Sequence, residues 1–127
     1  MKRQTAQRRA ILDALQHAPG PLTPQEVLDA ARAAHASLGL ATVYRNLSAL
    51  EESGEVVPVH LPGESARFEV SGRGHHHHFR CEHCQGVFEF TTTCPVAGLE
   101  GVTLPGGFRV RHHELTFYGL CSSCSDN

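Results

Sequence analysis

A chain of 127 residues with a net charge of −2 is long enough for one domain or two small ones. No stretch is apolar over the roughly 20 residues that a membrane-spanning helix requires, and the first nine residues are basic and polar, unlike a signal peptide. We therefore expect a cytoplasmic protein with no membrane partner. In that reducing compartment, cysteines bind metal more often than they form disulfides.

Charge is unevenly distributed along the chain. The first 50 residues contain six lysines and arginines against three acidic residues, whereas the remainder is acidic and rich in histidine. A basic first half suits contact with a polyanion, and a histidine-rich second half suits metal binding. Taken alone, the asymmetry is equally compatible with an ordinary solvated surface.

Two helices are predicted before residue 40. The first follows Thr5 and ends before the Pro- and Gly-rich breaker at residues 17–21. The second opens with a capping box, in which Thr23 is the N-cap, Pro24 the first helical residue and Glu26 the third. Because a capping box satisfies backbone N–H groups at the N-terminus of a helix, these residues predict that the second helix begins at Pro24.

A third helix and a hairpin complete the first half. The third helix is expected from about residue 40 to residue 53, with three apolar residues at helical spacing, Val43, Leu47 and Leu50. Residues 56–60 and 66–70 are predicted to be strands around a turn at residues 61–64. Three helices followed by a hairpin predict a winged helix-turn-helix domain over residues 1–70.

A hinge and a small sheet are predicted for the second half. Residues 71–74 carry two glycines and no apolar side chain, which is typical of a linker. Alternating patterns predict strands at 78–81, 87–90 and 108–118, and residues 94–99 are expected to form a short helix. The chain is thus predicted to be of the α+β class, with a small α/β domain at 75–127.

The cysteine spacing predicts a structural metal site in this second domain. Two Cys-x-x-Cys pairs are present, Cys81 with Cys84 and Cys121 with Cys124. Each pair lets one tight turn aim two sulfurs at the same ion, and two such turns complete the tetrahedral four-thiolate shell of structural zinc. Because that shell is closed, the four consecutive histidines at 75–78 must belong to at least one other site.

Candidate DNA contacts lie on the third helix. In a helix-turn-helix this helix enters the major groove and presents its outer, N-terminal residues to the bases. Arg45 can donate two hydrogen bonds to a guanine, and Tyr44 can contact a thymine methyl group or a phosphate. A solvated Arg45 and a packed Tyr44 are the alternative. The full candidate set comprises Thr42, Tyr44, Arg45 and Ser48 on the helix, with Arg8 and Arg9 as phosphate contacts.

The sequence resembles the ferric uptake regulator family over nearly its whole length. The motifs that carry the resemblance are residues 39–47 (GLATVYRNL), 67–69 (RFE), 75–84 (HHHHFRCEHC) and 113–121 (HELTFYGLC). The resemblance implies a dimeric repressor with an N-terminal winged helix and a C-terminal dimerisation domain. It also implies binding to double-stranded promoter DNA that depends on a regulatory metal.

By position, the resemblance also implies two regulatory metal sites. Glu69, His76 and His78 match the ligands of a site at the hinge. His75, His77 and His113 match a further site within the dimerisation domain.

The chain departs from the family pattern at several ligand positions. Where iron regulators of the family place a histidine before the second helix, this chain has Pro21, and His60 in the hairpin is a candidate substitute. Where many members have a glutamate, this chain has Val96, with Cys94 close by as a candidate ligand.

The ligand types favour zinc as the regulatory metal. Iron(II) and manganese sites usually include carboxylates, whereas an imidazole-rich set with a thiolate suits zinc. The chain is therefore most similar to a zinc uptake regulator. Zinc-sensing relatives often carry a cysteine near Val70 or Ser71, which this chain lacks, so an Fe(II)- or Mn(II)-responsive or peroxide-sensing regulator remains the alternative.

Other classes of protein fit less well. A zinc deaminase needs Pro-Cys-x-x-Cys well downstream of its His-x-Glu, but Cys121 follows residues 112–114 closely and comes after leucine. We therefore expect no catalysis and no small organic substrate. A histidine-rich metal store or chaperone is a further alternative, although it has no use for Tyr44 and Arg45.

Overall fold

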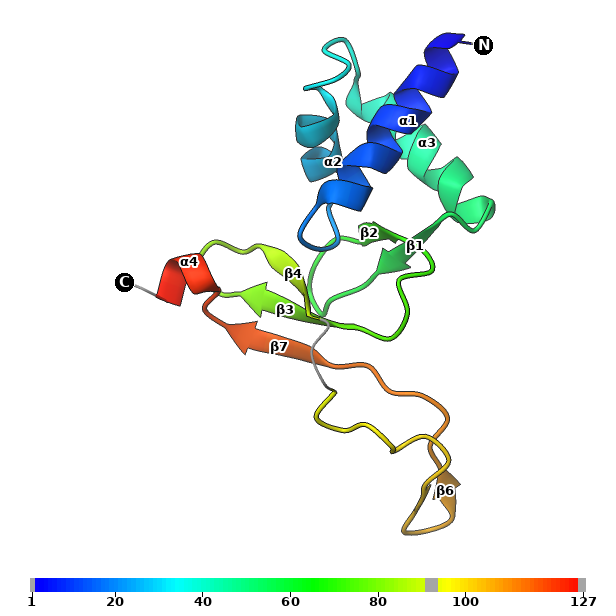
Figure 1. Ribbon diagram of the computed structural model, residues 1–127, viewed down its shortest axis with the longest axis vertical. Helices are drawn as coiled ribbons and strands as arrows, with labels where there is room; N and C mark the ends of the chain where they lie inside the picture. Colours follow the sequence, from blue (N-terminus) through cyan, green and yellow to red (C-terminus); the bar gives the residue numbers. More distant parts are fainter. Residues whose placement is uncertain (1, 91–93, 126–127) are drawn as a thin grey trace. The chain divides into compact units, whose positions relative to one another are not determined.

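A computed structural model describes residues 2–90 and 94–125, and the chain divides into two compact units, Met1–Arg73 and Gly74–Asn127. In the first unit, three helices precede an antiparallel pair of strands (Figure 1). These elements are α1 (Lys2–His17), α2 (Pro24–Ala31), α3 (Leu40–Glu52), β1 (Val56–Val59) and β2 (Arg67–Val70). None of the helices described is long and apolar enough to cross a membrane.

Local hydrogen bonds explain where α2 begins and α1 ends. The predicted capping box is confirmed, because Thr23 Oγ1 accepts from the Glu26 N–H at 3.2 Å and Glu26 Oε1 accepts from the Thr23 N–H at 2.9 Å. At the end of α1, the Arg73 guanidinium donates to the carbonyl of Leu15 at 3.1 Å. Both interactions satisfy backbone groups that a helix end leaves unpaired.

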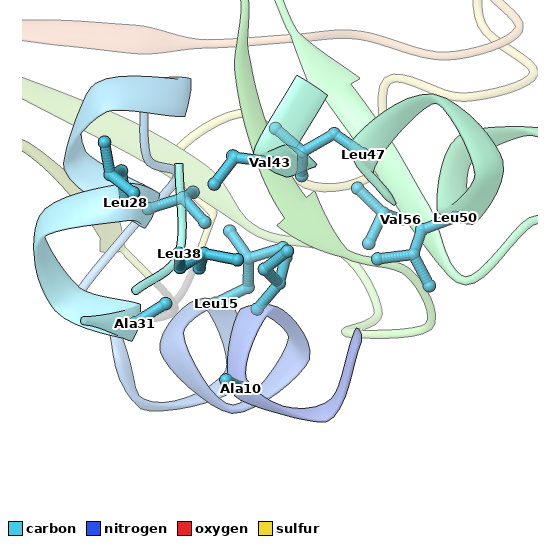
Figure 2. Close-up of a cluster of buried hydrophobic side chains, with 11 residues drawn as sticks. Ala10, Leu15, Leu28, Ala31, Leu38, Val43, Leu47, Leu50 and Val56 are labelled. Atoms are coloured by element: carbon cyan, nitrogen blue, oxygen red, sulfur yellow. The ribbon is translucent and has the colours of Figure 1, made fainter. Parts of the chain in front are cut away.

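The core of the first unit lies between the three helices and β1. Figure 2 shows this cluster, to which α3 contributes the three residues expected from its periodicity, Val43, Leu47 and Leu50. A backbone pair between Leu22 and Phe68, with N···O distances of 3.0 and 2.8 Å, also ties β2 to the segment before α2. The position of β2 is therefore coupled to that of α2.

The second unit is a small sheet with a hairpin extending from it (Figure 1). The sheet has the order β4-β3-β7, with β3 antiparallel to β4 and parallel to β7. Its elements are β3 (His77–Cys81), β4 (Val87–Phe90), β5 (Thr103–Leu104), β6 (Phe108–Arg109), β7 (Thr116–Gly119) and α4 (Ser122–Ser125). Among the described residues of this unit, only His77, Cys81 and Val87 are buried. So small a core is marginal unless metal adds stability.

Two predicted elements of the second unit are wrong. Residues 94–99 form turns instead of a helix, with Gly98 at φ +90°, a conformation that ends helical winding. The predicted strand at 108–118 is broken into β6 and β7. It breaks because the chain changes partners: the Val110 N–H bonds Val102 of the hairpin, whereas the Leu115 carbonyl accepts from His78 of the sheet.

Candidate metal centres

The four cysteines of the two pairs meet at one edge of the β4-β3-β7 sheet. Because β3 and β7 are parallel, with Cys81 opposite Gly119, the turn after β3 and the turn before α4 emerge on the same side. All four Sγ atoms lie within 4.8 Å of one another, and those of Cys84 and Cys121 are 3.9 Å apart. None of the cysteines forms a disulfide. The structure thus brings together the cysteines selected by their spacing.

This four-cysteine cluster fits zinc. Thiolates at about 2.3 Å from zinc in a regular tetrahedron are separated by about 3.8 Å. Backbone N–H groups of Cys121 and Cys84 point at Cys81 Sγ, at 3.4 and 3.5 Å, and lower the pKa of Cys81 to about 5. A hydrogen bond with Cys121 raises the pKa of Cys124 to about 12. One thiol therefore ionises readily and one resists, and a bound cation would favour the ionised form of both.

A second cluster lies on one face of β3 and contains His75, His77, Cys94 and His113; we call it the histidine–cysteine cluster. The Cys94 sulfur lies 3.2 Å from Nε2 of His77 and 3.2 Å from Nε2 of His113. The rings of His75 and His77 meet edge to face, with centroids 4.5 Å apart. Burial, followed by the charge of His75, lowers the pKa of His77. A neutral imidazole is the form that binds metal.

The donor atoms of this cluster are close to the spacing that a tetrahedral ion requires. Nitrogen at about 2.0 Å and sulfur at about 2.3 Å from zinc are separated by about 3.5 Å. The 3.2 Å contacts therefore need to widen by only a few tenths of an ångström. Cys94, a candidate on the grounds of proximity in sequence, is thus placed among the three histidines.

His76, which immediately precedes β3, and His78 alternate with His75 and His77 and so point to the opposite side of the strand; their ring centroids are 5.0 Å apart. His76 Nδ1 lies 2.9 Å from the carbonyl of Gly74, which fixes the proton on Nδ1 and leaves Nε2 as a donor to metal. Glu89 of β4, a residue that the sequence analysis missed, pairs with His78 across the sheet, and its Oε1 lies 3.7 Å from His76 Nε2. The pairing of β3 with β4 is the feature that could have identified Glu89, because it places Glu89 opposite His78.

The remaining predicted hinge ligands belong to the first unit. Glu69 lies on β2 opposite Val57. His60 is exposed in the turn between β1 and β2 and belongs to none of the groups of potential ligands among the described residues.

The outer face of α3 presents the candidate DNA contacts. Tyr44 is 53% exposed, Arg45 and Ser48 are exposed, and Arg45 Nη2 donates to Thr42 Oγ1 at 2.9 Å. A polar groove of about 420 Å³ runs between this face and α1, lined by Thr5, Gln7, Arg8, Thr42, Arg45 and Asn46. Arg9 is exposed, whereas Arg8 forms an ion pair with Glu55. A phosphate contact by Arg8 must therefore compete with that carboxylate.

Comparison with known proteins identifies the family. A profile of the ferric uptake regulator family matches residues 2–118. The chain belongs to the ferric uptake regulator family. Members of this family are metal-responsive transcription regulators, not enzymes, and this agrees with the expectation of no catalysis.

Relatives within the ferric uptake regulator family differ in the metal or stress named for them. The peroxide operon regulator of Bacillus subtilis is 34% identical over 127 residues, covering 97% of this chain and 84% of the relative. The zinc uptake regulator FurB of M. tuberculosis is 31% identical, covers 97% of this chain and 95% of that chain, and has a TM-score of 0.53. The structure of a zinc-bound manganese uptake regulator is 26% identical in sequence to this chain. The match covers 91% of this chain and 87% of that chain, with a TM-score of 0.76.

Proposed function

We propose that the chain is a zinc-responsive repressor that acts in the cytoplasm and binds promoter DNA of metal-uptake genes as a homodimer. The observation that carries the choice of zinc is the donor set of the histidine–cysteine cluster, which among the described residues has three imidazoles, one thiol and no carboxylate. Such donors favour zinc over Mn(II) and Fe(II), whose sites are rich in oxygen. The four-cysteine cluster is assigned to a second, structural zinc.

An Fe(II)- or Mn(II)-responsive regulator is the alternative, and one observation favours it. The predicted hinge ligands Glu69, His76 and His78 include a carboxylate, and Glu89 Oε1 lies 3.7 Å from His76 Nε2, a mixture that also suits Fe(II) and Mn(II). Because this set discriminates poorly between metals, we base the assignment on the histidine–cysteine cluster.

Regulation follows from how the hinge ligands are divided between the units. Glu69 belongs to the first unit, and His76 and His78 belong to the second. Holding one ion together would fix the winged-helix domain, residues 1–70, against the dimerisation domain, residues 75–127, across the hinge at 71–74. The two recognition helices of a dimer would then have a fixed spacing, which lowers the ordering cost of entering successive major grooves. A typical coupling of about 1–3 kcal/mol strengthens DNA binding roughly 5- to 150-fold per site.

Apolar exposure supports a dimer formed through the second unit. Among the described residues of this unit, five large apolar side chains are exposed: Val102, Leu104, Phe108, Tyr118 and Leu120, with Phe108 at 70%. A unit with so small a core gains stability when a second copy covers exposed apolar side chains of this kind.

The proposal is tested by titrating operator binding with buffered zinc, Fe(II) and Mn(II), on protein that already holds its structural zinc. The operator is selected from a random-sequence DNA library. Zinc is expected to activate binding at a lower free concentration than Mn(II) or Fe(II). Cys94→Ser should reduce the preference for zinc, whereas the matched change Cys94→His should retain it. Activation by Mn(II) or Fe(II) at physiological free concentrations, without activation by zinc, would overturn the assignment.

A further inference from the structure

Glu100 contacts the histidine–cysteine cluster without being one of its four donors. Its Oε1 lies 2.6 Å from His113 Nδ1, while Nε2 of the same ring lies 3.2 Å from the Cys94 sulfur. The carboxylate therefore lies against the ring nitrogen that faces away from the cluster. The contact is an ion pair by distance, but it does not meet the geometry of a hydrogen bond to Nδ1.

The contact favours one of the two neutral forms of the ring. A carboxylate oxygen offers only lone pairs, so its position 2.6 Å from Nδ1 favours a proton on that nitrogen. In the neutral ring, Nε2 is then unprotonated and presents its lone pair toward Cys94. This is the tautomer that can bind an ion held by Cys94 and His77.

We propose that Glu100 is a positioning residue for this metal site: it holds His113 in the Nδ1–H tautomer and orients Nε2 toward the ion. Carboxylates that accept from the far nitrogen of a ligating histidine raise its basicity and fix its orientation, and their removal costs roughly 10- to 100-fold in metal affinity. The inference rests on the proposed metal role of the cluster. It also gives Glu100 a role different from that of a direct ligand.

The test compares Glu100→Ala, Glu100→Gln and Glu114→Gln in the full chain with its structural zinc retained. Gln at position 100 keeps an acceptor for Nδ1–H. Glu114 is exposed beside His113 and serves as the matched control, because its change removes the same charge without removing the contact. Zinc affinity is measured against a chromophoric chelator, and the Co(II)-substituted site is followed by its absorption spectrum.

We expect Glu100→Ala to lose roughly 10- to 100-fold in zinc affinity, with an unchanged Co(II) spectrum at saturation. Glu100→Gln should stay within a few-fold of the wild type, and Glu114→Gln should match it. Wild-type affinity in Glu100→Ala would overturn the proposal. So would a changed Co(II) spectrum with equal losses in both Glu100 variants, because Glu100 would then be a ligand.

A readout on protein without regulatory metal separates this inference from the proposed function. Long-range ¹H–¹⁵N correlation spectra should show the Nδ1–H tautomer for His113 in the wild type and a mixture of tautomers in Glu100→Ala. An Nε2–H tautomer in the wild type would overturn the positioning role even if zinc binds. Failure of the wild type to bind zinc beyond its structural ion would instead overturn the metal role of the cluster.

Discussion

Replacing Arg45 by alanine removes the side chain best placed to contact a base. Arg45 is exposed on the outer face of α3, and its bond to Thr42 Oγ1, at 2.9 Å, holds the guanidinium beside the helix. A bidentate contact with guanine contributes about 1–3 kcal/mol. Because a dimer presents two such helices, the loss is about 2–6 kcal/mol, which weakens binding roughly 30-fold to 2 × 10⁴-fold.

The assay is fluorescence anisotropy with the zinc-loaded protein and a selected operator, repeated over a range of salt concentrations. For Arg45→Ala we expect the salt dependence to remain and discrimination against random DNA to fall. Arg9→Ala, at a candidate phosphate contact, should weaken binding to every sequence and lower the salt slope by about 0.9 per phosphate. An Arg45→Ala dimer that binds the operator within twofold of the wild type would refute the assignment of α3 as the recognition helix.

Three further outcomes are expected. Cys121→Ser should cost one zinc per chain and unfold the second unit, measured by metal analysis and circular dichroism; a folded unit without zinc would contradict the structural role. Thr23→Ala should lower the free energy of unfolding by about 1 kcal/mol in urea denaturation, whereas Thr23→Ser should not. The Ser53 hydroxyl, with a smaller contribution from Arg8, lowers the pKa of Glu55. The stabilisation by Glu55 is therefore complete above the unfolded pKa of about 4.3 and is lost as pH falls through the folded pKa. Glu55→Gln should accordingly be less stable than the wild type at pH 6, and this deficit should shrink below pH 4; a deficit independent of pH would exclude the ionised carboxylate, with its contacts to Ser53 and Arg8, as its cause.

Sequence signals predicted the first half of the chain well because those signals are local. The capping box at Thr23 and the apolar spacing that ends before Gly54 each act within one helix. The predicted strands of the hairpin agree with β1 and β2 to within one residue at each end.

The second half was harder to predict because pairing between distant segments decides its structure. Alternation at 108–118 indicated a single strand, but the segment leaves β5 and joins β3, and a pattern within the segment cannot show that change. Turn-forming glycines, among them Gly98, outweighed the apolar residues of the helix expected at 94–99.

The candidate ligands also divide into those that local spacing predicted and those that only the pairing of distant segments brings to the site. Spacing alone selected the four cysteines, because each pair is a local turn. Glu89 and Glu100 were missed, since one approaches the histidines across the sheet and the other from the segment before the hairpin. Cys94 lies 17 residues from His77 in sequence, yet only 3.2 Å separates their donor atoms.

The central claim is that an ion shared by Glu69, His76 and His78 fixes the spacing of the two recognition helices. It is tested most directly by measuring operator affinity of one folded dimer that retains its structural zinc, first stripped of regulatory metal and then with zinc restored. We predict that restoring zinc tightens binding roughly 5- to 150-fold per site, with the effects of the two protomers multiplying. Equal affinity in the two states would contradict the account.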